Sequence, residues 1–561
     1  MTHLPQNLPA VQNYYILLLM LCHTALFAQA DTCAVVVSEH QMQVNALRAN
    51  VWNDDNGSPT LAGIGALEYQ GPDMDQPVPV AFQTGVWVGA LGAGGTPLVG
   101  VTNFYPSFPE PFSITQVVPF TTCGLFEQPW VVSGAAITEH LTELAANGAP
   151  LEERPALYGY PGRDNPHFEG VNGFALPAAT DLAPFFDADG NNVYDPDQGD
   201  YPLPRDVAAG AIPAELVWSI FSRQTLTNGT VNAQPPLLVR RTVFAYACAD
   251  DPLLNATVFT QRTLSHFGTE ALDSLYIAAF TDFELGCFSD DYSGSVPALH
   301  TVYNYNRDTV DADCGTAFQR PVPVVAATLL DRPATSIGIY SNSGVNVAPP
   351  ATTDPLVPIE YYRYLTGSWR DGTPYTEGGN GYGGDTPTPF LYPDNPNGPG
   401  WSMLEEDRLP NDYRTLLSSY VGGLAPTETF TFDVAYSVHD VTGGNHLSHV
   451  NTMYAQLPLL QGHYDAGFAN VDCPTLTAAP VRADRFDLRV SPNPAAGQFT
   501  VRTENYPIDE LVAYDARGRE LLRRQPRSAT VEVRTAGLPT GLVLLHVRSG
   551  DRWTVRKVVV D

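Results

Sequence analysis

Glycine and proline interrupt this chain throughout, and they limit what it can fold into. The 561 residues include 47 glycines and 49 prolines, and only 16% of the residues are charged. Frequent breakers argue against coiled coils and helical bundles, while a hydrophobic content of 44% argues against a disordered chain. The composition therefore predicts a mainly β protein rich in turns, and the length allows roughly three or four domain-sized units.

The charge is acidic and unevenly distributed. The chain has 29 Lys and Arg against 60 Asp and Glu, a formal net charge of -31, and its only lysine is Lys557. Residues 481–561 contain 14 basic and 10 acidic residues, so the excess of negative charge lies before them. Such a chain is a poor partner for nucleic acid, and the split indicates two modules with different surfaces.

The amino terminus, residues 1–30, has the layout of a secretory signal peptide. An apolar run over 14–28 ends in small residues, which predicts cleavage between Ala30 and Asp31. This run is too short for a membrane helix, which needs about 20 residues, and no later segment is long and apolar enough. No transmembrane segment is therefore expected in the mature chain. The alternative is that the run forms a buried strand.

Six cysteines remain after removal of the signal peptide. In an oxidising compartment an even number predicts three disulfides, with fifteen possible connectivities. Cys287 and Cys314 are the most local pair. A zinc site is the alternative, although no CxxC or Cys–His spacing supports it. The disulfide candidates are Cys33, Cys123, Cys248, Cys287, Cys314 and Cys473.

Seven short runs of strand composition, separated by turn residues, follow residue 486. Their spacing predicts a small C-terminal seven-stranded immunoglobulin-like β-sandwich without a catalytic constellation. The predicted strands are 486–490, 498–503, 508–514, 519–524, 529–534, 541–549 and 552–560.

The same residues resemble the type A carboxy-terminal sorting domain of proteins exported by the Bacteroidetes type IX secretion system. The resemblance implies two-step export, by the signal peptide and then by the sorting domain 486–561. It implies the type IX translocon and its sorting-domain peptidase as partners, cleavage in the linker 474–485, and an extracellular or cell-surface location. The residues that carry it include Pro492, Asn493, Pro494, Gly518, Gly541 and Lys557.

The central region, residues 31–473, reads as mostly β, and we expect one large β-sandwich-like unit or two closely packed ones. Two stretches predict helices, 136–146 before a glycine cap and 446–460. Segments 85–89, 199–202 and 368–374 also make this region similar to large uncharacterised secreted Bacteroidetes proteins, a resemblance that implies no activity.

An Asp-rich loop, residues 187–200, has the spacing of a calcium site. Oxygen-bearing side chains at relative positions 1, 3, 5 and 9, with a main-chain carbonyl at position 7, can wrap a hard cation. Asn192 stands where a left-handed residue is needed, and Gln198 replaces the bidentate Glu of an EF-hand. The loop resembles those of extracellular repeat and dockerin-type modules, which implies structural Ca²⁺; the alternative is a metal-free loop of Asx turns. The predicted ligands are Asp187, Asp189, Asn191, Val193 and Asp195.

Two weaker features also suggest ligands. An acidic group near Cys287 predicts either a second cation site or an acidic surface loop. Aromatic residues over 361–382 predict either stacking platforms for surface glycans or packing within the protein. The members of the acidic group are Asp282, Glu284, Asp290 and Asp291.

Motifs of known enzymes are missing: the sequence contains no GxSxG, HExxH, Walker A or Rossmann pattern. The leading hypothesis is a secreted or cell-surface protein whose central region is a binding or structural module. The alternative is an extracellular hydrolase acting on polysaccharide, because a pair of carboxylates that meet only in the fold leaves no sequence signature.

Overall fold

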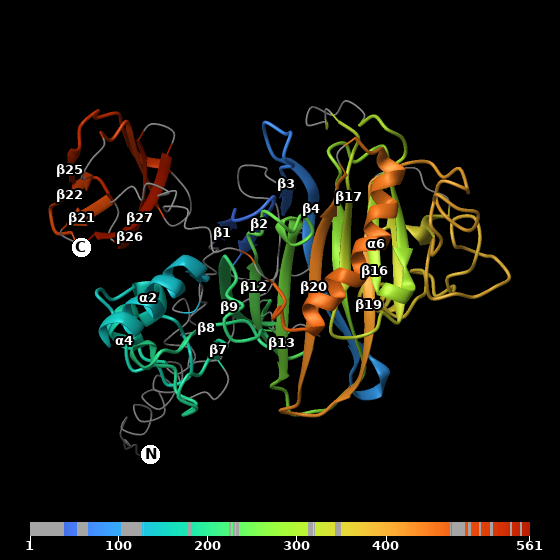
Figure 1. The fold of residues 1–561 in the computed structure, drawn as a ribbon, viewed down its shortest axis with the longest axis horizontal. Coiled ribbons are helices and arrows are strands. Elements are labelled where there is room, and N and C mark those ends of the chain that lie inside the picture. Colours follow the sequence, from blue (N-terminus) through green and yellow to red (C-terminus); the bar gives the residue numbers. More distant parts are fainter. Residues whose placement is uncertain are drawn as a thin grey trace, which may run out of the picture. The chain divides into compact units, whose positions relative to one another are not determined.

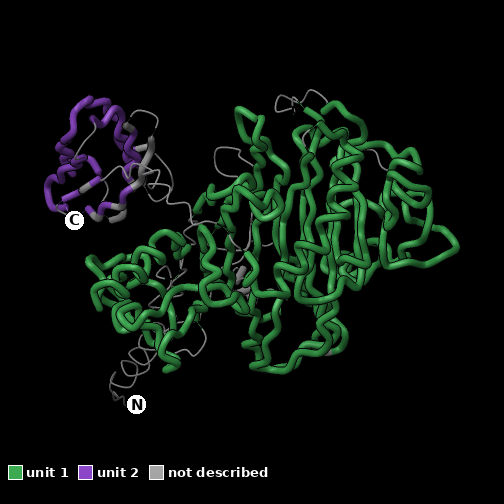
Figure 2. The backbone as a smooth tube through the Cα atoms, in the orientation of Figure 1, with its two compact units in different colours: residues 1–475 green, residues 476–561 purple. Residues whose placement is uncertain are grey.

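The computed structural model describes residues 39–560 with several gaps. Contacts divide the chain into two compact units, Met1–Thr475 and Leu476–Asp561 (Figure 2). The predicted signal peptide with Ala30 and Asp31, the linker 474–485, and the cysteines Cys33, Cys123 and Cys314 lie outside the described residues. The gaps are 53–65, 102–125, 127, 177–181, 224–225, 228–229, 232–234, 312–317, 319, 343–348, 442, 472, 474–487, 492–494, 504–506, 516–519, 539–540 and 550–551.

The first sheet of the larger unit is antiparallel and has the strand order β1-β2-β3-β4-β14-β19-β18, with β5 added beside β4. Its centre brings together three strands that are distant in the sequence, because β14 pairs with β4 on one side and β19 on the other. The strands are β1 (Glu39–Met42), β2 (Leu47–Trp52), β3 (Leu67–Tyr69), β4 (Val78–Leu91), β5 (Pro97–Gly100), β14 (Leu272–Phe283), β18 (Ser336–Ser341) and β19 (Tyr413–Leu424).

The second sheet is also antiparallel and has the order β15-β16-β17-β20-β13-β12-β9-β6. Its long central strands pair in continuous register, for example Leu237–Ala245 with Glu215–Arg223. The strands are β6 (Trp130–Ser133), β9 (Glu215–Arg223), β12 (Leu237–Ala245), β13 (Thr257–His266), β15 (Asp291–Val296), β16 (Thr301–Asn306), β17 (Val324–Leu329) and β20 (Thr429–His439).

The two sheets pack face to face around one continuous hydrophobic core (Figure 1). Their outer faces are covered as well, by helix α5 (Pro358–Leu365) on the first sheet and helix α6 (His446–Asp465) on the second. Trp87 of β4, for example, stacks on Phe280 at 5.1 Å and meets Tyr361 of α5 edge-on at 4.8 Å. Strands covered on both faces are buried at every position, as β17 is, which removes the alternation that identifies a strand in a sequence.

Local capping explains where the two predicted helices begin. Asn445 and Ser448 form a reciprocal capping box before α6, which begins at His446 as predicted and continues past the predicted end. Ser133 caps helix α2 (Gly134–Asn147), and Gly148 closes it with φ +73°. In the part of the chain that the structure describes, no helix is long and apolar enough to cross a membrane.

An insertion between β6 and β9 carries α2 and the Asp-rich loop. A two-residue ribbon, β7 (Phe185–Phe186) with β8 (Tyr201–Pro202), joins the two ends of that loop. The insertion also contains α3 (Pro155–Tyr158), α4 (Phe168–Asn172) and the 3-10 turn η3 (Pro196–Gln198); short elements elsewhere are β10 (Leu226–Thr227), β11 (Thr230–Val231), η1 (Ala93–Gly95), η4 (Leu254–Ala256), η5 (Pro297–Leu299) and η6 (Pro350–Thr352).

The smaller unit is a seven-stranded sandwich of two antiparallel sheets, β21-β22-β25 and β24-β23-β26-β27. Its own core contains fully buried Phe499, Leu511 and Leu545. This unit and the larger sandwich confirm the predicted fold class. The strands are β21 (Leu488–Ser491), β22 (Gln498–Thr503), β23 (Glu510–Asp515), β24 (Glu520–Arg524), β25 (Thr530–Arg534), β26 (Gly541–Ser549) and β27 (Arg552–Val560).

Candidate functional site

The Asp-rich loop is a set of nested Asx turns. The carboxylate of Asp187 accepts main-chain N–H groups of Gly190 (2.8 Å) and Asn192 (2.7 Å), and the side chain of Asn191 accepts that of Val193 (2.6 Å). Asn192 has φ +67°, the left-handed conformation predicted for it. These bonds hold the carboxylates of the loop in fixed directions.

Asp200 is a site residue that the sequence analysis did not select. It is fully buried, and its two carboxylate oxygens accept the main-chain N–H groups of Ala188 (2.7 Å) and Asp195 (2.8 Å). Carboxylate oxygens of Asp187, Asp189 and Asp200 lie within 4.8 Å of one another. Burial raises the pKa of Asp200, and the neighbouring charges of Asp187 and Asp189 raise it further. A bound cation would relieve that repulsion.

Asp195, predicted as a ligand of the same ion, faces elsewhere. It caps η3, and its Oδ1 lies 3.3 Å from Nε2 of His167. The structure therefore groups the predicted ligands Asp187 and Asp189 with Asp200, and groups Asp195 with His167 and Asp197.

The second acidic group lies between the ends of the two sheets. Asp282 and Arg414 form the last residue pair between β14 and β19. Asp291 is the first residue of β15 in the other sheet. Burial raises the pKa of Asp291 well above its usual range, and the charges of Asp290 and Glu284 add to the shift. Asp282 and Asp291 are therefore buried, while Glu284 and Asp290 are partly exposed beside them.

Arg414 is the cation that faces this region from β19. Its Nη2 lies 3.4 Å from Oδ2 of Asp282 and 3.6 Å from Oδ2 of Asp412, and its Nε lies 3.7 Å from Oδ1 of Asp354. One arginine does not offset the burial of several carboxylates, so the pKa of Asp282 remains well above its usual range. No sequence pattern relates Asp412 and Arg414 to Asp282, because both are distant from it in the chain.

Cys287 does not add a thiolate ligand to this region. Asp290 and Asp311 lie near its sulfur, at distances that would allow all three residues to hold one cation. The sulfur is in a disulfide bond, however, and therefore cannot be a thiolate. The main-chain N–H of Cys287 donates to Oδ1 of Asp311 at 3.0 Å, and burial raises the pKa of Asp311 to about 6.

Glu284 should make stability depend on pH. Burial and the charge of Asp412 raise its pKa from 4.5 to about 7, so the folded protein holds this proton more tightly than the unfolded chain does. Its stabilising contribution is complete below about pH 4.5 and is lost as the pH rises to about 7. In urea unfolding, the free energy of unfolding of Glu284→Gln should exceed that of the wild type by up to about 3 kcal/mol at about pH 8. Near pH 4 the two free energies should be equal.

A matched control for that experiment is Glu270→Gln, since Glu270 is exposed. It should leave the free energy of unfolding within about 0.5 kcal/mol of the wild type at both pH values. If both variants gained the same free energy of unfolding at the higher pH, the effect would come from net charge and not from the buried carboxyl group.

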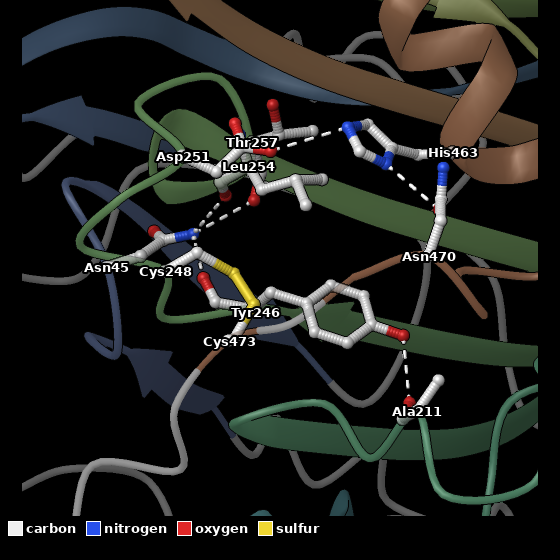
Figure 3. The surroundings of a disulfide bond; sticks show 10 residues. All are labelled: Asn45, Ala211, Tyr246, Cys248, Asp251, Leu254, Thr257, His463, Asn470 and Cys473. Atoms are coloured by element: carbon white, nitrogen blue, oxygen red, sulfur yellow. Dashed lines mark hydrogen bonds and ion pairs between the residues drawn. A yellow bond between two sulfur atoms is a disulfide. The ribbon is translucent and has the colours of Figure 1, made fainter.

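A disulfide bond joins Cys248 to Cys473 across 225 residues of sequence (Figure 3). This pair occurs in three of the fifteen connectivities that the sequence left open. Cys248 follows β12, and the adjoining turn is held by Asn45, whose Nδ2 donates to the carbonyl oxygens of Tyr246 (3.1 Å) and Thr257 (2.9 Å). The bond ties the last described residue before the linker to the second sheet.

The aromatic stretch packs inside the larger unit. Tyr361, Tyr364, Trp369 and Tyr375 are each at most 3% exposed, and the indole N–H of Trp369 donates to the carbonyl oxygen of Gly381 at 2.7 Å. These four rings are therefore core residues, and they offer no stacking platform to a glycan.

The smaller unit carries the sorting motif. Pro492, Asn493, Pro494 and Gly518 lie outside the described residues, while Gly541 begins β26 and Lys557 pairs with Leu544 in β27. Residues 489–561 match the family described as the secretion system C-terminal sorting domain. The match identifies the protein as a type IX secretion cargo, destined for the cell surface or the extracellular space. No curated protein matches the sequence.

Proposed function

We propose that the central region acts outside the cell as a structural or binding module that is stiffened by calcium at the Asp-rich loop. The observation that carries the proposal is the convergence of Asp187, Asp189 and Asp200 within 4.8 Å, in a loop closed by the ribbon of β7 and β8. Extracellular calcium modules bind with Kd values of about 10⁻⁴–10⁻³ M, so a site with three carboxylates suits the secreted location.

A hydrolytic role receives less support. Among the described residues, no Asp or Glu lines the groove along α2 or the cavity between the two sheets. Asp282 is buried beside Arg414 and the side chain of Asp412 is only 12% exposed, which leaves a polysaccharide little access to this acidic pair. We therefore favour a module that binds or supports over one that cleaves.

Calcium should raise the melting temperature of the protein. At about ten times its Kd, an ion bound only to the folded state stabilises it by about 1.4 kcal/mol. Asp187→Asn together with Asp189→Asn keeps the Asx turns and removes two charges, so the rise should disappear in this variant.

The matched control is Asp73→Asn with Asp75→Asn, an exposed pair with the same spacing in another turn. It should respond to calcium as the wild type does. Identical melting curves of the wild type in calcium and in chelator would refute the calcium site.

A further inference from the structure

Two side chains of the Asp-rich loop, Asp195 and Asp197, converge on one point with His167. Nε2 of His167 lies 3.3 Å from Oδ1 of Asp195 and 3.5 Å from Oδ2 of Asp197. All three potential ligand atoms lie within 4.8 Å of one another, and the side chains are 30%, 23% and 44% exposed, respectively. A solvent ion can therefore reach the point that they share.

The separations fit a metal better than they fit an ion pair. A charge-assisted N–H···O bond is usually about 2.7–2.9 Å long, shorter than either His167 distance. In a tetrahedral zinc site with bonds of about 2.0–2.2 Å, neighbouring ligand atoms are about 3.3–3.6 Å apart. The two His167 separations, 3.3 Å and 3.5 Å, lie within that range.

Groups outside the triad orient its members. The hydroxyl of Tyr158 donates to Oδ1 of Asp197 at 2.5 Å, which leaves Oδ2 facing His167. The ring of Tyr158 also meets the His167 ring edge-on at 4.8 Å, and buried Asn165 accepts the main-chain N–H of His167 at 2.8 Å. Partners of this kind keep metal ligands in position and tune their affinity.

Helix α2 holds the segment between the two carboxylates. The carbonyl oxygen of Pro196 is 2.8 Å from Nε2 of fully buried His140, so the backbone that joins Asp195 to Asp197 is anchored in the interior. The ligand positions are therefore set by contacts that exist without an ion, which lowers the cost of ordering them on binding.

We propose that His167, Asp195 and Asp197 form a binding site for a divalent transition metal, of which Zn²⁺ is the representative. An imidazole nitrogen with two carboxylate oxygens suits zinc, whereas calcium and magnesium take oxygen ligands. The site is distinct from the group of Asp187, Asp189 and Asp200. Three protein ligands leave a coordination position for water.

The full-length secreted protein is titrated with Zn²⁺ in saturating calcium, and binding is measured by calorimetry. A second titration uses Co²⁺, and binding is measured by visible absorption. The wild type should bind one zinc ion, and bound cobalt should show the intense absorption of tetrahedral coordination. His167→Ala should weaken zinc binding by about 100-fold or more. Asp197→Asn, which keeps the acceptor for Tyr158, should also weaken it.

The matched control is His40→Ala, because His40 is 27% exposed and pairs with a single carboxylate, Glu215, at 2.9 Å. It should bind zinc as the wild type does, and circular dichroism should show that every variant is folded. Absence of zinc binding, equal affinity in His167→Ala, or displacement of zinc by calcium would each overturn the proposal. The calcium response tested with Asp187→Asn is a separate measurement, so the two proposals can fail independently.

Discussion

Deletion of residues 486–561 should abolish delivery of the protein to the cell surface. The deleted residues have their own two sheets and their own core, so the larger sandwich should still fold without them. The truncated protein should remain with the cells, because it lacks residues 489–561, which match the secretion system C-terminal sorting domain. Fractionation of cells and medium, with immunoblotting against the central region, measures the change.

Two substitutions at neighbouring positions separate folding of the sorting domain from its mere presence. Phe499 is fully buried in β22, whereas Gln498 beside it is exposed. Phe499→Asp should block delivery, because loss of a buried Phe costs about 3–5 kcal/mol even before a charge is buried. Gln498→Asp should leave delivery unchanged. Truncated protein in the medium at the wild-type level would contradict the sorting role.

The smaller unit could be predicted almost strand by strand. Its strands are exposed on one face and alternate in polarity, as the pattern of Thr530–Arg534 shows, and turn residues separate them. The strands 498–503, 541–549 and 552–560 have the predicted bounds. Local rules are sufficient for the strands themselves, because each is short and ends at a turn; the pairings of β22 with β25 and of β23 with β26 are not local.

The larger sandwich could be predicted only as a class. The pairing of β14 with β4 and with β19 joins segments that no local signal relates, and strands buried on both faces lose their alternation. The aromatic residues over 361–375 show the same limit, since a core and a glycan platform use the same side chains. Their burial becomes apparent only when α5 is placed on the first sheet.

In the candidate sites too, local features could be predicted from the sequence and contacts between distant residues could not. Spacing alone selected Asp187 and Asp189 as candidate ligands, because an Asx-rich loop is a local structure. Asp200 and His167 were not among the candidates, since they reach the other side chains only through the β7–β8 ribbon and the packing of α4 near η3. Arg414 meets Asp282 only through sheet pairing. Residues that act locally can thus be read from the sequence, and their distant partners require the fold.

Replacement of both Cys248 and Cys473 by Ala should lower the free energy of unfolding by about 5 kcal/mol, because the bond closes a loop of 225 residues. The effect comes from the unfolded chain, whose freedom the bond restricts. Denaturant unfolding under oxidising conditions measures it.

The single variants Cys248→Ala and Cys473→Ala provide the control. Each breaks the same bond, so each should cost nearly as much as the double variant. If the losses of free energy of unfolding in the two single variants added up to the loss in the double variant, packing of the sulfurs and not the cross-link would be responsible. Because Cys473 directly precedes the predicted linker 474–485, the bond should also hold the end of the central region to the second sheet. Limited proteolysis of the double variant should then release a segment near His463, whose Nε2 pairs with Asp251 at 3.3 Å beside the disulfide.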